Sequence, residues 1–231
     1  MFNLKLKPRE YKDLLLERTL EFKSKVDYNT RYTVAAYRQN RESIEAKYTK
    51  QDEMTYNCPY LGYVDDSNSK IGCMIHPIFT GDPKSQNFSF YGTSICQGYD
   101  CKNKEHIASS LIESLILKVA KSSIEFSHLA SDHILIFALE KWLSFKGWSI
   151  SEGIEKMESL LIKILQLRLY VEDSFYPTSF EIRYEQFLDE SDVYKLIEDY
   201  ASMNAIEKEV DEVKRLGDEI LTEMKNTPAR I

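Results

Sequence analysis

All four cysteines of this chain fall in one stretch, between residues 58 and 101 of its 231. The surrounding residues 55–102 hold five of the eight glycines and three of the six prolines. This density of turn formers excludes a long helix there, whereas both flanking sequences have apolar residues at helical spacing. The sequence therefore predicts a mainly α protein, a helical bundle with a small irregular Cys-rich insertion that contains short β-strands.

This change of texture divides the chain into three segments. Residues 1–54 are expected to form an N-terminal helical segment, residues 55–102 a Cys-rich metal-binding module, and residues 103–231 a C-terminal helical bundle. We expect the three segments to form one compact unit. The N-terminal helix begins near Pro8, and its apolar pattern weakens beyond Tyr28, which indicates either a second helix or a partly buried continuation.

Local patterns predict the individual elements. Short strands are expected at 60–64, 71–75 and 88–91, and the polar residues 65–69 predict that the first two strands pair as a hairpin. The helices expected after the insertion are 107–119, 128–145, one capped by Ser151, 180–188, 193–203 and 205–224.

Composition is that of a globular protein, with 43% hydrophobic and 29% charged residues. The net charge of −7 is uneven, because residues 151–231 carry 10 basic against 19 acidic side chains. An acidic surface repels phosphate, so we expect no nucleic-acid binding. The more basic residues 1–50 could meet an acidic protein partner or the chain's own acidic part. We see no targeting or membrane-spanning segment and expect a cytoplasmic protein, in which thiols stay reduced.

The four cysteines, Cys58, Cys73, Cys96 and Cys101, are the candidate metal ligands. Four soft thiolates match tetrahedral Zn²⁺ or an iron–sulfur cluster. Metal binding would also stabilise a segment that has little apolar content. His76 is a fifth candidate, because its two-residue gap from Cys73 is that of a metal knuckle. A site of three cysteines and His76 is therefore the alternative ligand set.

Two other interpretations of the cysteines remain open. Free cysteine is among the most buried residue types, so the four could be inert core residues. Thiol–disulfide chemistry is the other alternative, although the sequence has no Cys-x-x-Cys pair. The core interpretation has to explain why all four gather in one short window while the helical sequence after Cys101 has none.

A resemblance adds to the metal interpretation. Residues 58–63 (Cys-Pro-Tyr-Leu-Gly-Tyr), 71–77 (Ile-Gly-Cys-Met-Ile-His-Pro) and 90–101 resemble the core of cysteine-rich bacterial proteins grouped as zinc- or iron-chelating. In that group a Cys-Pro-aromatic-Leu segment precedes a second cysteine that a proline soon follows. The resemblance implies chelation and no reaction. Members typically open with a dense run of cysteines, which is absent before Cys58.

A weaker pattern lies further along the chain. Glu125 and His128 have the Glu-x-x-His spacing of carboxylate-bridged di-iron proteins, and Asp132 would share their helix face. Such sites need two motifs and further carboxylates, and the chain has one. An ordinary helix start is therefore expected, with a helical enzyme that binds a second metal here as a further hypothesis. No other catalytic motif was found, so the sequence leaves open whether the protein is an enzyme.

The last helix carries an apolar stripe with heptad-like steps, which consists of Ile206, Val210, Val213, Ile220 and Met224, with Gly217 between them. The stripe is compatible with a homodimer through the C-terminal helix or with a helix packed on its own core. The function expected is a metal-binding protein with a structural zinc or an iron–sulfur cluster used in sensing or electron transfer. The alternative is an acidic helical interaction or scaffold protein without catalytic activity.

Overall fold

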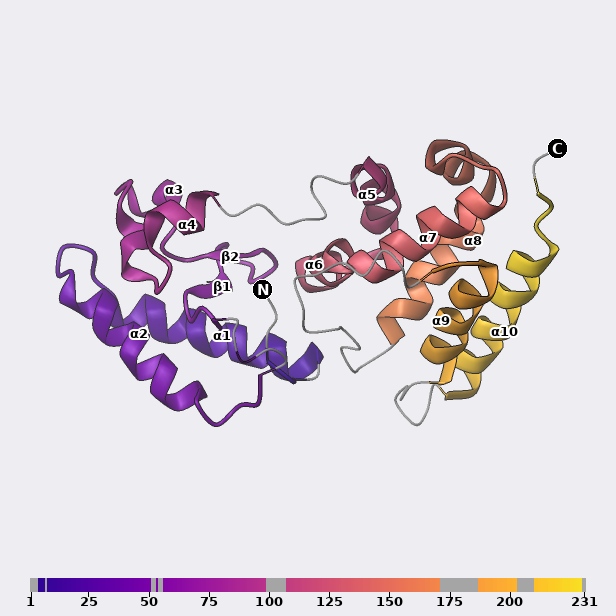
Figure 1. Ribbon diagram of the computed structural model, residues 1–231. Helices are drawn as coiled ribbons and strands as arrows, with labels where there is room; N and C mark the ends of the chain where they lie inside the picture. The colour runs from indigo at the N-terminus through magenta and orange to yellow at the C-terminus, as the bar shows by residue number, and fades with distance from the viewer. Residues whose placement is uncertain are drawn as a thin grey trace. The chain divides into compact units, whose positions relative to one another are not determined.

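The computed structural model describes residues 4–6, 8–50, 53, 56–98, 107–170, 187–202 and 210–229. The chain divides into two compact units (Figure 1). The first unit comprises residues 1–100 with 122–124, and the second comprises residues 101–121 with 125–231. The predicted N-terminal helical segment and nearly all of the Cys-rich module thus lie in the same unit.

The first unit combines a helical hairpin with short irregular elements. Its elements are α1 (Pro8–Lys25), α2 (Tyr32–Glu45), β1 (Leu61–Tyr63), β2 (Ile71–Cys73), α3 (Pro77–Thr80), the 3₁₀ helix η1 (Ser85–Phe88) and α4 (Gly92–Gly98). α1 and α2 lie side by side in the ribbon, and α1 also packs against β1 (Figure 1). The weakened apolar pattern beyond Tyr28 therefore marks a turn into a second helix.

The predicted hairpin is confirmed. β1 and β2 pair antiparallel, with Leu61 opposite Cys73 and Tyr63 opposite Ile71. The polar turn closes because the Asp65 carboxylate accepts hydrogen bonds from the backbone N–H groups of Ser69 and Lys70. Side-chain acceptors of this kind replace the ladder where the chain reverses.

The third predicted strand, at 88–91, is wrong. Residues 85–88 form η1, and the chain then bends into α4. Side chains stabilise the bend, since the N–H of Thr93 donates to Asn87 Oδ1 at 2.9 Å and the N–H of Gly92 donates to Ser89 Oγ at 3.1 Å. Aromatic residues at 88–91 favour a strand by propensity, but these local side-chain acceptors favour turns.

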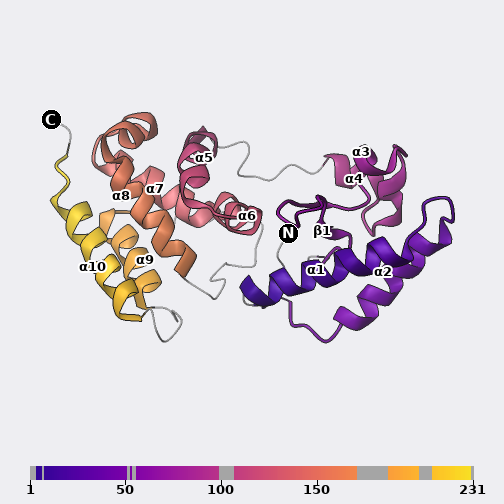
Figure 2. The ribbon, with the colours of Figure 1, turned by 180° about the vertical axis from the view of Figure 1, so that it is seen from behind.

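The second unit is helical, and the prediction of a mainly α protein is confirmed. Its helices are α5 (Ile107–Val119), α6 (Ser123–Ser131, which begins in the first unit), α7 (His133–Phe145), α8 (Ile150–Tyr170), α9 (Glu190–Ser202) and α10 (Val210–Asn226). α9 and α10 lie side by side in both ribbon views and pack on α8 (Figure 2). Among the residues that the structure describes, no helix is long and apolar enough to cross a membrane.

Several helix boundaries differ from the predictions, and most of the helix expected at 180–188 lies outside the described residues. Capping side chains explain two of the differences. The single helix expected over 128–145 is divided, because Asp132 caps α7 by accepting the Leu135 N–H at 3.0 Å. The cap of α8 is Ser149 and not Ser151. Ser149 Oγ accepts the Glu152 N–H, and the Glu152 carboxylate accepts the Ser149 N–H. This reciprocal pair is a capping box.

Among the described residues of the second unit, one continuous apolar cluster takes buried residues or partly buried neighbours from each of the helices α5 to α10. The stripe of α10 belongs to it, since Val213, Gly217, Ile220 and Met224 are buried. α10 packs this stripe against α9 and α8 of its own chain. The structure thus shows the intramolecular packing that the sequence left as one of two alternatives.

The described part of the first unit has three smaller apolar clusters. Residues from beyond the insertion complete one of them, because Ile124 packs with Leu15 and Tyr63. The neighbouring Ser123 hydroxyl donates to the Ser69 carbonyl at 2.7 Å and accepts the Ile71 N–H at 3.1 Å. Ser123 and Ile124 therefore attach the start of α6 to the hairpin of the first unit.

Candidate metal centre

Cys58 and Cys73 begin two turns of the same design. In the first turn, the Leu61 N–H donates to the Cys58 carbonyl at 3.3 Å. In the second turn, the His76 N–H donates to the Cys73 carbonyl at 3.0 Å. A backbone N–H two residues after each cysteine lowers the pKa of its thiol and so favours the thiolate, which is the form that binds metals.

The β-hairpin brings the two turns together. The first turn leads into β1 and the second leaves β2, and the pairing places Leu61 opposite Cys73. One bond links the turns directly, because the Met74 N–H donates to the Tyr60 carbonyl at 2.9 Å. Cysteines that are far apart in sequence thus lie at the same end of the hairpin.

Cys96 joins this pair from α4. Its sulfur is 3.1 Å from Ser89 Oγ, and Ser89 also donates to the Gln86 carbonyl at 2.8 Å. The side-chain amide of Gln86 donates to the Cys73 sulfur at 3.9 Å. Gln86 of η1 and Ser89, the residue that follows η1, therefore supply polar contacts to two of the three sulfurs.

The three thiols are also electrostatic neighbours. The pKa of Cys58 is raised to about 12, because burial, the largest cause, and the charges of Cys73 and Cys96 together outweigh the lowering by the Tyr60 N–H and Arg18. Burial likewise raises the pKa of Cys73, and Cys96 adds to that effect. All three cysteines are partly buried and none forms a disulfide. A cation bound among the three thiols would offset both the burial of the thiolates and their mutual repulsion, and would so lower these pKa values.

Side chains from outside the turns fix the Cys73 turn. The Tyr28 hydroxyl donates to the Met74 carbonyl at 2.9 Å, and Ser85 Oγ donates to the Ile75 carbonyl at 2.7 Å. Tyr28 follows α1, and Ser85 begins η1. The turn is thus held by contacts from residues distant in sequence.

The other two predicted ligands have different outcomes. His76 is exposed and caps α3, where its Nδ1 accepts the Ile78 N–H at 3.2 Å. Its Nδ1 is thus used for the helix, and only Nε2 could reach a metal. Cys101 lies outside the described residues. Three of the five predicted ligands, Cys58, Cys73 and Cys96, lie in one region of the first unit, and their role as metal ligands stays a prediction.

As placed, these side chains are neighbours without a finished coordination shell. Among the described residues, no group of three or more His, Cys, Asp or Glu side chains is arranged to hold a metal ion. Binding would have to draw the sulfurs closer together. Metal sites built from thiols normally couple such closure to folding and to proton release.

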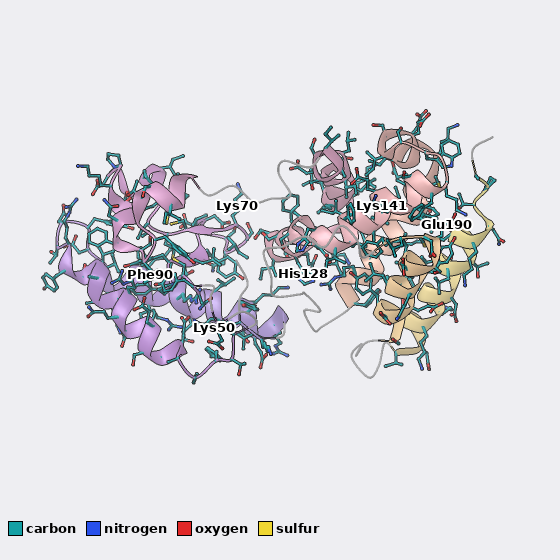
Figure 3. The ribbon with its side chains drawn as sticks, in the orientation of Figure 1. Lys50, Lys70, Phe90, His128, Lys141 and Glu190 are labelled. Carbon is teal, nitrogen blue, oxygen red and sulfur yellow. The ribbon has the colours of Figure 1, made fainter. Side chains whose placement is uncertain are left out.

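The weaker sequence pattern, Glu125, His128 and Asp132, consists of residues with structural contacts. The Glu125 carboxylate accepts the Lys121 N–H at 2.6 Å, and Asp132 pairs with Arg168 at 2.7 Å, both side chains being 1% exposed. His128 lies on α6 (Figure 3), and burial followed by the charge of Arg168 lowers its pKa to about 4. Because Asp132 is committed to Arg168, this face is used for a helix start and a buried ion pair.

Sequence reasoning missed the polar residues that support the cysteines, above all Gln86, Ser89 and Arg18. One signal was available for Arg18. It falls within the apolar stripe of α1, between Leu15 and Phe22, and a charged residue on a buried face must have a partner. Gln86 and Ser89 gave no signal, because ordinary polar residues in a turn are common.

The chain matches no family model, no curated protein and no solved structure.

Proposed function

We propose that this protein binds a metal ion or an iron–sulfur cluster through Cys58, Cys73 and Cys96, with Cys101 as the fourth ligand. The observation that carries the proposal is the pair of matching turns at Cys58 and Cys73, which the hairpin holds side by side with Cys96 near them. A cysteine that only fills space in a core needs no such turn. The resemblance to zinc- or iron-chelating proteins supports the same conclusion.

A full set of four thiolates has consequences for chemistry. It leaves no open coordination position, so a zinc ion held this way is structural and does not activate water. An iron–sulfur cluster in the same ligands would instead serve sensing or electron transfer. Either function requires reduced thiols, in agreement with the cytoplasmic location that we propose.

A second candidate function is partner binding. Four large apolar side chains are more than half exposed on or near α3 and α4 of the first unit: Ile78, Phe79, Phe90 and Ile95. Exposed apolar groups that gather on one part of a surface are typical of protein interaction sites. In this interpretation the cysteine region stiffens a scaffold.

Metal analysis of the untagged full-length protein, purified without oxygen, tests the proposal. We expect about one zinc per chain in colourless protein, or iron and sulfide with visible charge-transfer absorption. Single Cys→Ser variants at positions 58, 73, 96 and 101 should each lower metal content and shift the thiolate-to-Co²⁺ absorption of cobalt-loaded protein. A stably folded wild-type protein that binds neither metal would refute the proposal.

The fourth ligand is decided by a matched pair of histidine variants. If Cys101 completes the site, His76→Ala should retain metal as well as His133→Ala, a control on α7. If His76 is a ligand, only His76→Ala should lose metal, and Cys101→Ser should retain it. The Co²⁺ spectrum distinguishes the two sets, because its charge-transfer intensity grows with the number of thiolates.

A further inference from the structure

We infer that Arg18 is the positioning residue of this metal site, holding the Cys58 turn in the shape that presents its sulfur. This inference rests on the proposed function. Arg18 lies on α1, far from the cysteines in sequence, and its side chain is 1% exposed. It acts on the site only through the backbone of the turn.

The contacts of Arg18 bracket the turn. Its Nη1 donates to the Cys58 carbonyl at 3.2 Å and to the Leu61 carbonyl at 3.3 Å. These two carbonyls belong to the first and last residues of the turn that carries the Cys58 sulfur. A single side-chain nitrogen therefore fixes the distance between the two ends of the turn.

Neighbouring groups complete the support. The Tyr37 hydroxyl donates to the Pro59 carbonyl at 3.1 Å, and the Met74 N–H donates to the Tyr60 carbonyl at 2.9 Å. Every backbone carbonyl from residue 58 to 61 thus accepts a hydrogen bond from a described residue. Groups that orient a ligand in this way commonly change metal affinity by about 10- to 100-fold when removed.

The role requires an arginine. The guanidinium of Arg18 is itself oriented by Glu45, which accepts bonds from Nε at 2.8 Å and from Nη2. The opposite end of the planar group is then directed at the turn. A lysine ammonium is a compact charge without this fork, so it cannot hold the carboxylate and both carbonyls in one fixed geometry.

The chain offers a matched control. Arg41 is equally buried, at 0% exposed, and its Nε donates to the same Glu45 at 2.9 Å. Its remaining contacts among the described residues are to Glu17 and Glu21, at 2.7 and 3.0 Å. Arg41 therefore shares the charge, the burial and the ion-pair partner of Arg18 but binds helix side chains in place of the turn.

The experiment compares wild type, Arg18→Lys and Arg41→Lys as full-length proteins. Zn²⁺ affinity is measured by competition with a chromophoric chelator, and Co²⁺ absorption and thermal unfolding are recorded for each protein. We expect both variants to lose stability, but only Arg18→Lys to weaken Zn²⁺ binding, by about 10- to 100-fold, and to alter the Co²⁺ bands. Equal affinities in the two variants, whether reduced or unchanged, would overturn the inference.

The remaining outcomes separate the proposed function from the role of Arg18. If wild type itself binds no metal, the proposed function fails, whereas metal binding that Arg18→Lys leaves intact defeats only the role of Arg18. If Arg18→Lys does not fold without metal, zinc release to a chelator is measured on the metal-loaded proteins, and faster release than from Arg41→Lys is the expected result. Failure of Arg18→Lys to fold even with zinc, while Arg41→Lys folds, would assign Arg18 to the fold and overturn the inference.

Discussion

The two units of this chain are built on different principles. The second unit buries one continuous apolar cluster drawn from six helices. The first unit has three small clusters among its described residues, and a network of Arg18, Arg41 and Glu45 lies buried between its helices. A buried ion-pair network fixes the orientation of its side chains but adds little to the free energy of unfolding, because desolvation of the charges offsets much of their attraction.

This difference explains where a metal would matter. A domain with a small apolar core commonly relies on a second source of stability, and a structural metal is one such source. In the first unit, the polar network holds the backbone around Cys58, and the metal binding that we propose would still have to draw the sulfurs together. The second unit has no comparable need, and its polar cluster around Asp132 and Arg168 serves helix capping.

Metal removal is the largest expected effect and tests the comparison directly. A chelator should remove hydrogen-exchange protection from residues 8–98 and leave residues 107–170 protected, because structural zinc contributes about 10 kcal/mol or more in small zinc domains. Exchange mass spectrometry of the full-length protein measures both regions at once. Equal loss of protection in the two units would contradict the comparison.

A core substitution should produce the opposite pattern. Trp142 is 0% exposed within the cluster of the second unit, so Trp142→Ala should lower the free energy of unfolding of that unit by about 3–5 kcal/mol. Metal content should not change. Leu117→Ala is the control, since that side chain on α5 is 64% exposed and its loss should have little effect on denaturant unfolding.

A smaller effect depends on pH and on the second unit alone. The pKa of His128 is lowered to about 4 by burial and by Arg168, with Asp132 opposing. The side chain has a pKa near 6.5 in the unfolded chain, so between pH 6.5 and 4 the unfolded state binds a proton that the folded state does not. The folded state is therefore not destabilised by His128 above about pH 6.5. The free energy of unfolding should fall by about 1–3 kcal/mol as the pH falls from 6.5 to 4.

His128→Gln provides the check on this pH effect. Its free energy of unfolding, measured by urea titration at several pH values, should fall less steeply than that of wild type between pH 6.5 and 4. Parallel curves for the two proteins would show that His128 is not the group responsible.

The smallest effect concerns the contact between α9 and α10. A Cβ added at Gly217 would lie 2.3 Å from the Cβ of Ala201, so Gly217→Ala should force the helices apart. Overpacking costs about 1–3 kcal/mol, and the better helix propensity of alanine offsets about 1 kcal/mol of that. Thermal unfolding should show a modest loss that the double variant Gly217→Ala with Ala201→Gly recovers.

The sequence predicted the fold where local patterns decide it. The helix at 107–119 and the hairpin around Asp65 follow from apolar spacing and turn chemistry, and the structure has both. The strand predicted at 88–91 failed because Asn87 and Ser89 supply hydrogen-bond acceptors that favour a bend. Whether such a segment forms a strand or a turn depends on the side chains around it, and residue propensity alone does not decide it.

The sequence identified the candidate cysteines of the site but not the residues that support them. The clustering of cysteines identified Cys58, Cys73 and Cys96 as candidates that the structure places near one another. Their supporting groups come from α1, α2 and η1, which no spacing rule connects to a cysteine. Contacts such as that between Arg18 and the Cys58 carbonyl depend on how the helical hairpin packs on the loops, and this packing is a property of the whole unit.

The contribution of Ser123 and Ile124 to the first unit bears on how the protein acquires its structure during synthesis. The hydroxyl of Ser123 bonds the hairpin, and Ile124 fills the cluster of Leu15 and Tyr63. A nascent chain that has emerged only to residue 100 therefore lacks part of its own interior. The N-terminal unit can complete its packing on the ribosome only after residue 124 has left the exit tunnel, when the next helices have begun to follow.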